Sequence, residues 1–236
     1  MNSTQATARF AGIVYLLFSL LAMFGYFYVP GALVDTADAA ATARKILEGA
    51  SLYRLGILAS LLGHMLFIVL ALSLYQLFRE VDRMQARLLV AFVCVGVAGE
   101  LVNLAYRMAP LMLLSGASYL SSFSRPQLEA LALGFLRLGG SLSIVLTMIW
   151  GLWLFPFGIL TIKSGWFPRF LGYLLFASGV GYVVTSVAQI AFPDPFRTFS
   201  RFVTPLAMGE LVMVLWLAII GARVPRAAAE PTRAAV

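Results

Sequence analysis

Six long apolar runs dominate this sequence, and short polar segments separate them. The runs cover approximately residues 10–29, 52–78, 88–114, 131–162, 170–192 and 202–220. An α-helix rises about 1.5 Å per residue, so roughly 20 helical residues cross the apolar layer of a bilayer, which is about 30 Å thick. Each run is long enough for that. The sequence therefore predicts an all-α polytopic membrane protein, a bundle of about six transmembrane helices.

Composition supports a single membrane domain over residues 1–236. Hydrophobic residues make up 61% of the chain and charged residues 11%, whereas a soluble domain carries roughly a quarter charged residues. The apolar runs occupy nearly all of the length and leave no room for a separate globular unit. We therefore expect one transmembrane domain and no soluble domain beside it.

The segments between and after the runs carry weaker signals. Residues 32–51 are predicted to form a short extracytoplasmic helix or a solvated connector, with Thr36 able to cap its start and Gly49 its end. The fourth run is long enough to tilt, or to kink at Pro156. Residues 221–236 are Ala-rich and too few to fold alone, so we expect a disordered cytoplasmic tail.

The distribution of Lys and Arg predicts the orientation, because cytoplasmic segments near helix ends are enriched in these residues. Six helices put both termini on one side. With that side cytoplasmic, it holds nine basic residues: Arg9, Arg79, Arg83, Arg87, Lys163, Arg169, Arg223, Arg226 and Arg233. The other side holds six: Arg44, Lys45, Arg54, Arg125, Arg197 and Arg201. We therefore predict a multi-pass protein of the bacterial cytoplasmic (inner) membrane with both termini cytoplasmic.

The residues that are scarce here exclude several kinds of chemistry. Cys94 is the single cysteine and His64 the single histidine, so a disulfide, thiolate cluster or bis-histidine haem within one chain is not expected. The two lysines, Lys45 and Lys163, lie at segment ends, which excludes a retinal Schiff base at mid-membrane. The basic residues are scattered singly, so membrane lipids are the expected partners and nucleic acid is not. We expect no cofactor, no metal and no recognisable catalytic set.

Ionisable and polar side chains inside the predicted helices form the candidate site. Such groups cost about 2.5 to 3.5 kcal/mol at the centre of a transmembrane helix on insertion scales, so each one needs a partner. Glu100, Asn103 and Arg107 share one helix face because they are spaced three and four residues apart. The other members of this candidate ligand-binding set are His64, Arg137 and Glu210.

Two interpretations of this set are open. Two acids and two bases sum to zero, so mutual neutralisation inside the bundle would explain them without a ligand. Alternatively, they line a polar pocket. Under the predicted topology most of them lie between the midplane and the outer surface. We therefore predict a cavity there, open to the extracytoplasmic side, in which Arg107 or Arg137 pairs with Glu210 or Glu100.

Small residues recur every four positions on two of the predicted helices. They are Gly139, Ser143, Thr147 and Gly151 on the fourth and Ala177 and Gly181 on the fifth. Such spacing lets helix backbones approach closely, which is how helices pack in lipid. The pattern predicts tight helix–helix packing and no ligand site.

Several blocks of the chain resemble one bacterial membrane-protein family, catalogued as domain of unknown function 4386. The blocks, which lie within about residues 8–193, are Val29-Pro30-Gly31-Ala32-Leu33, Asp38-Ala39-Ala40-Ala41-Thr42, Ser51-Leu52-Tyr53-Arg54-Leu55-Gly56-Ile57, Ala71-Leu72-Ser73-Leu74-Tyr75-Gln76-Leu77, Gly151-Leu152-Trp153-Leu154, Lys163-Ser164-Gly165-Trp166-Phe167-Pro168-Arg169-Phe170-Leu171-Gly172 and Gly179-Val180-Gly181-Tyr182. The resemblance implies a multi-helix membrane protein, and it implies no reaction, ligand or catalytic residue. One departure is at residues 136–140, Leu-Arg-Leu-Gly-Gly, where the family is expected to have a histidine.

Three functions are compatible with the sequence. The first is a carrier, sensor or accessory subunit that binds a small or amphipathic ligand between its helices. The second is a membrane enzyme acting on a lipid or isoprenoid, with Glu100 or Glu210 as acid or base and Arg107 or Arg137 holding an anionic head group. The third is a ligand-free scaffold. The missing catalytic set favours the first and third.

Overall fold

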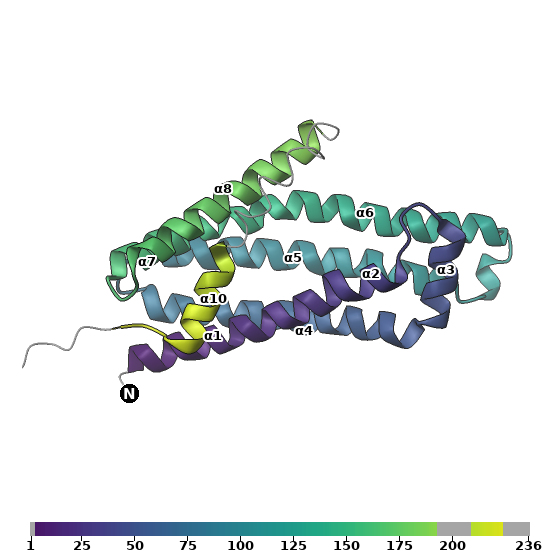
Figure 1. The fold of residues 1–236 in the computed structure, drawn as a ribbon. Helices are drawn as coiled ribbons and strands as arrows, with labels where there is room; N and C mark the ends of the chain where they lie inside the picture. Colours follow the sequence, from purple (N-terminus) through teal and green to yellow (C-terminus); the bar gives the residue numbers. More distant parts are fainter. Residues whose placement is uncertain (1–2, 193–208, 224–236) are drawn as a thin grey trace, which may run out of the picture.

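The computed structural model describes residues 3–192 and 209–223, and all regular secondary structure in these ranges is helical (Figure 1). The elements are α1 (Ser3–Ala22), η1 (Met23–Tyr28), α2 (Val29–Leu33), α3 (Ala39–Glu48), α4 (Ala50–Phe78), α5 (Arg83–Leu113), η2 (Ser118–Leu120), α6 (Arg125–Leu152), α7 (Leu154–Ser164), α8 (Arg169–Ala191) and α10 (Gly209–Ile219). Five helical stretches are long and apolar enough to cross a membrane: Thr4–Leu33, Ala50–Phe78, Arg83–Leu113, Arg125–Ser164 and Arg169–Ala191. The predicted all-α polytopic bundle is confirmed.

Helix boundaries differ from the sequence prediction at several places. The first helix begins at Ser3 instead of Phe10, since its polar lead is also helical. α5 begins at Arg83 instead of Leu88 because the Asp82 side chain accepts a hydrogen bond from the Gln85 amide and caps the start. Of the sixth predicted helix, residues 202–208 lie outside the described ranges, and α10 alone is shorter than a span. Residues 224–236 of the predicted tail also lie outside them.

The first span contains a π-helical turn, η1, between α1 and α2. In this turn the Val29 amide donates to the Phe24 carbonyl, five residues earlier. The next residue, Pro30, has no amide hydrogen. The Gly25 carbonyl therefore receives no hydrogen bond from either residue that would normally serve it, and it is free to accept one from another helix.

The segment predicted as a short helix or connector contains α3. Its N-cap is Asp38 and not Thr36, because the Asp38 carboxylate accepts from the Ala41 amide at 2.9 Å. Gly49 ends it as predicted. One face of α3, including Ala43 and Ile46, is fully buried, so α3 packs on the bundle and is more than a solvated connector.

The long fourth span breaks at Trp153, three residues before the predicted kink at Pro156. A proline ring clashes with the carbonyl four residues before it and cannot donate to it. For Pro156 that residue is Leu152, the last of α6. The break therefore falls one turn upstream of the proline that causes it, and Trp153 becomes buried in the core at 1% exposure.

One end of the bundle gathers the segments predicted to share a side of the membrane. The N-terminus, the loop between α4 and α5, the turn between α7 and α8 and the end of α10 all lie there (Figure 1). Lys163 Nζ donates to Asp82 Oδ2 at 2.7 Å, and this bond lowers the pKa of the Asp82 carboxyl. The Arg223 amide donates to the Trp166 carbonyl at 2.9 Å. The assignment of this end to the cytoplasm stays a prediction.

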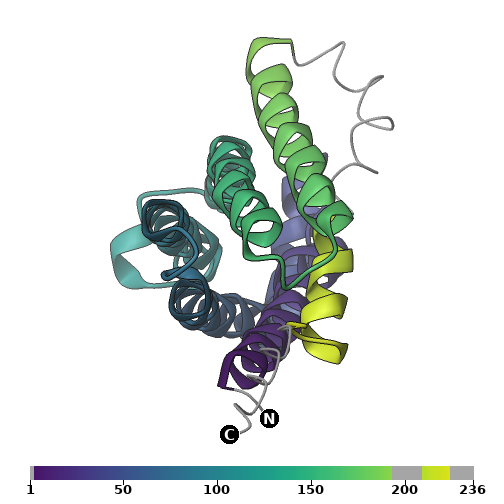
Figure 2. The same ribbon diagram turned by 90° about the vertical axis from the view of Figure 1, so that its left-hand side faces the viewer.

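A helical hairpin with facing glycines joins the fourth and fifth spans. A Cβ placed on Gly151 would lie 2.8 Å from the Gly179 carbonyl, and one on Gly158 would lie 3.0 Å from the Gly172 carbonyl. Each pair is equidistant in sequence from Gly165, which turns the chain with a φ of +66°. The backbones of α6 and α7 thus touch the backbone of α8, and α10 lies between α8 and α1 (Figure 2).

Candidate functional site

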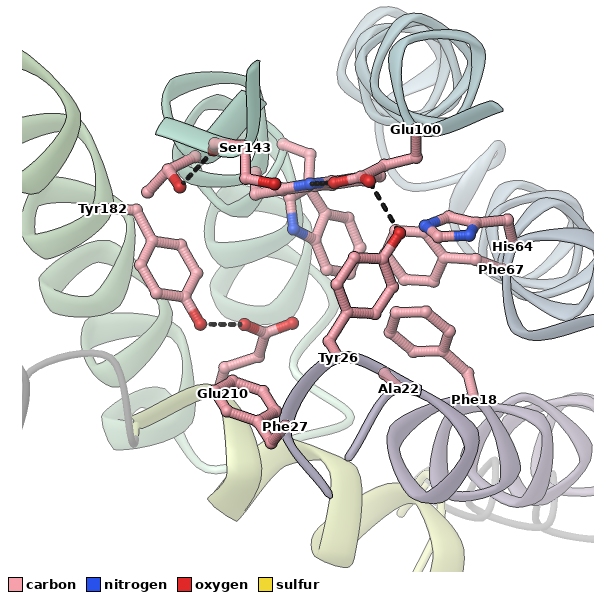
Figure 3. Close-up of a pocket in the computed structure, with 13 residues that line it drawn as sticks. Phe18, Ala22, Tyr26, Phe27, His64, Phe67, Glu100, Ser143, Tyr182 and Glu210 are labelled. Atoms are coloured by element: carbon pink, nitrogen blue, oxygen red, sulfur yellow. Dashed lines mark hydrogen bonds between the residues drawn. The ribbon is translucent and has the colours of Figure 1, made fainter. Parts of the chain in front are cut away.

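A cavity of about 330 Å³ lies between the helices near the middle of the bundle (Figure 3). His64 and Glu100, close to the midpoints of α4 and α5, both reach it. Aromatic rings make up most of the wall, and two carboxyl groups face them. The lining residues are Phe18, Ala22, Tyr26, Phe27, His64, Phe67, Glu100, Ser143, Thr147, Trp150, Trp153, Tyr182 and Glu210.

Glu100 accepts hydrogen bonds from three uncharged donors. Tyr26 Oη donates to Glu100 Oε2 at 2.7 Å, Asn103 Nδ2 to the same oxygen at 3.2 Å, and Trp150 Nε1 to Oε1 at 3.4 Å. The residue is only 5% exposed. The Glu100 carboxyl group is thus the acceptor for donors from the first, third and fourth spans.

Glu210 faces Glu100 from the other side of the cavity and also accepts from uncharged donors. The hydroxyl of Tyr15 donates to Oε1, and Tyr182 Oη donates to Oε2 at 3.0 Å (Figure 3). Tyr15 comes from α1 and Tyr182 from α8, so Glu210 ties the start of α10 to both helices.

His64 presents one ring nitrogen to a carbonyl and keeps the other available. Nδ1 lies 2.7 Å from the Ser60 carbonyl oxygen. A carbonyl only accepts, so Nδ1 carries the hydrogen and Nε2 is an acceptor in the neutral ring. Nε2 has no hydrogen-bond partner among the described residues, and His64, at 3% exposure, belongs to the cavity wall.

Arg107 is buried behind the cavity wall and contacts no carboxylate. One guanidinium nitrogen donates to Ser60 Oγ at 3.0 Å and another to the Gly25 carbonyl at 2.6 Å. Its Cζ lies 5.0 Å from the centroid of the Tyr26 ring. The carbonyl freed by the π-helical turn is therefore the acceptor that holds this arginine in the bundle.

The predicted pairing of these arginines with the acids is wrong. Within the described residues no ion pair joins Arg107 or Arg137 to Glu100 or Glu210, and Tyr26 stands between Arg107 and Glu100. Arg137 lies near the middle of α6, exposed, with its guanidinium donating to the Thr36 carbonyl at 2.7 Å. Of the four charged residues that the sequence suggested would neutralise one another, Glu100 and Arg107 are buried, Glu210 is half-buried and Arg137 is exposed.

Asn103 belongs to the same cluster but does not line the cavity. It is 2% exposed, and its Nδ2 also donates to Ser143 Oγ at 2.9 Å. A Cβ on Gly139 would lie 2.7 Å from Asn103 Oδ1. The first two members of the small-residue pattern on α6, Gly139 and Ser143, therefore pack against α5 at this amide, and Ser143 also lines the cavity together with Thr147.

Sequence reasoning missed the aromatic donors of the site. Tyr15, Tyr26, Tyr182 and Trp150 each donate to one of the two carboxyl groups that line the cavity. Their positions inside apolar runs were a usable signal, because a hydroxyl or indole N–H within a membrane also needs a partner. In the described parts of the chain, no group of three His, Cys, Asp or Glu side chains is arranged to hold a metal ion.

Comparison with known proteins places the chain in a family without an assigned activity. An uncharacterised protein of Archaeoglobus fulgidus is 31% identical over 88 residues, which cover 36% of this chain and 49% of that protein. The match thus spans about half the length of this relative. No solved structure matches the chain. The family described as Domain of unknown function (DUF4386) matches residues 10–221, nearly the whole sequence, and the chain belongs to this family.

Proposed function

We propose that this protein binds a small or amphipathic ligand in the cavity between its helices, as a carrier, sensor or accessory subunit of the bacterial inner membrane. The observation that supports the proposal is the cavity itself. Protein interiors pack closely and leave few voids larger than a water molecule. A volume of about 330 Å³ is instead within the range of small-molecule sites, roughly 300 to 1,000 Å³.

The wall of the cavity has the composition of a ligand site. Most of it is apolar and aromatic, and a few polar groups from different helices converge on the space. Phe27 lines the cavity and is 75% exposed. Phe27 therefore lies between the cavity and the outer surface of the described part of the bundle. An amphipathic molecule can approach this surface from the lipid.

Filling the cavity should abolish ligand retention without unfolding the bundle. Ala22 lines the cavity, so Ala22→Phe places a ring in it. Ala98 is exposed on α5, so Ala98→Phe adds the same ring on an outer face. We expect native mass spectrometry of gently purified protein to show a co-purified small molecule on the parent and on Ala98→Phe, and none on Ala22→Phe.

Thermal unfolding of all three proteins serves as the control for folding. A parent protein that carries no small molecule across several mild detergents and nanodiscs would contradict the proposal and favour a ligand-free scaffold. Equal retention by folded Ala22→Phe and by the parent would show that any bound molecule lies elsewhere.

A further inference from the structure

Both acids that face the cavity have uncharged partners. Glu100 and Glu210 accept hydrogen bonds from hydroxyl, amide and indole groups. Arg107 is the only arginine or lysine buried in the described part of the bundle, and it does not line the cavity. Among the described residues, two acids thus face the cavity and no arginine or lysine does.

The rest of the wall suits a positive charge as well. Aromatic faces carry negative electrostatic potential and attract organic cations, which is why rings surround quaternary ammonium groups in many proteins. The cavity is lined by rings of Phe18, Tyr26, Phe27, Phe67, Trp150, Trp153 and Tyr182. The unpartnered His64 Nε2 adds a hydrogen-bond acceptor in the neutral ring.

We infer that the ligand is a lipophilic organic cation, a substituted ammonium group whose charge lies between Glu100 and Glu210 and whose apolar part lies against the aromatic wall. The inference rests on the proposed function, because it assigns the chemical class of the molecule held in that same cavity. Arg137 is exposed and donates to the Thr36 carbonyl, so among the described residues no arginine or lysine forms an ion pair with either acid.

The test compares three probes of similar shape and different charge on the whole protein in nanodiscs. The probes are benzyltrimethylammonium, its uncharged carbon isostere neopentylbenzene, and the anion phenylacetate. We expect equilibrium dialysis to show saturable binding of the cation at least tenfold tighter than of either other probe. The cation should also raise the unfolding temperature of the parent in a concentration-dependent way.

Variants locate the bound charge. Glu100→Gln and Glu210→Gln should each weaken cation binding about tenfold, Ala22→Phe should abolish it, and Ala98→Phe should leave it unchanged. The probe comparison on the parent decides the case even if a Gln variant fails to fold.

The outcomes separate the two proposals. Tighter binding of neopentylbenzene or phenylacetate, blocked by Ala22→Phe, would overturn the cation assignment and leave the cavity as a ligand site. Cation affinity unchanged in folded Glu100→Gln and Glu210→Gln would also overturn the assignment. Both proposals would be overturned by two results together. One is that no probe shows binding that Ala22→Phe blocks, and the other is that the parent protein carries no small molecule in native mass spectrometry.

Discussion

Gly151→Leu is expected to destabilise the bundle more than any other single substitution on α6. Gly151 faces Gly179, and a Cβ on either residue would lie within 3.0 Å of the other's carbonyl oxygen. Such an atom cannot be accommodated by a side-chain rotation, since the opposing atoms belong to the backbone. The helices must move apart and lose van der Waals contacts along the hairpin, which drive helix association in lipid. Overpacking of this kind costs about 1 to 3 kcal/mol, and a leucine at a backbone contact should reach the upper end.

A second glycine of the same helix provides the matched control. Gly140 has open space where its Cβ would be, so Gly140→Leu should unfold at the temperature of the parent. The measurement is thermal unfolding in one detergent, followed by size-exclusion chromatography. If Gly151→Leu and Gly140→Leu behave alike, the close approach of α6 and α8 is not what holds this hairpin together.

Arg107→Met should destabilise the bundle by a comparable or larger amount. The substitution leaves the buried Gly25 carbonyl without its donor, and an unsatisfied buried acceptor costs about 1 to 3 kcal/mol. It also removes the positive charge on the far side of Tyr26 from Glu100. We expect a loss of about 2 to 4 kcal/mol in the free energy of unfolding.

Arg137→Met is the control for the loss of one arginine, because that side chain is exposed and its guanidinium donates to the Thr36 carbonyl. It should cost less than about 1 kcal/mol. The free energy of unfolding can be measured for both variants by reversible SDS titration in mixed micelles. Similar losses at the two positions would mean that the hydrogen bond to Gly25 contributes little to the fold.

The sequence predicted the five described spans because each of them contains a single continuous run of apolar residues. It failed where structure depends on contacts between runs. Pro156 was recognised as a helix breaker, yet the break falls at Trp153, since the clash acts on the residue four positions earlier. We recognised no sequence pattern for the π-helical turn. Its consequence is a Gly25 carbonyl that no helix amide serves, and this becomes apparent only in the structure, where Arg107 donates to it.

The same limit applies to the candidate site. The periodicity of α5 correctly grouped Glu100, Asn103 and Arg107, because residues three and four apart share a helix face. Periodicity within one helix could not predict which charged side chains meet between different helices. Counting acids and bases suggested neutral pairs, but in the structure the acids accept from tyrosines, and Arg137 is exposed near the middle of α6. The glycine contacts between helices also escaped prediction. Gly151 contacts Gly179 and Gly158 contacts Gly172, so the contacts recur every seven residues and not every four as the sequence pattern suggested.

The central claim is that the space between Glu100 and Glu210 holds a ligand, and a cryo-electron microscopy density map of the protein in nanodiscs tests it most directly. The two carboxyl groups approach the cavity from opposite walls, and the rings of Tyr26 and Tyr182 lie beside them (Figure 3). We predict a compact density in this space that no residue of the chain accounts for, in contact with both acids and absent from the map of Ala22→Phe. A map in which side chains of the chain fill the space, or in which both acids meet arginine or lysine, would contradict the account.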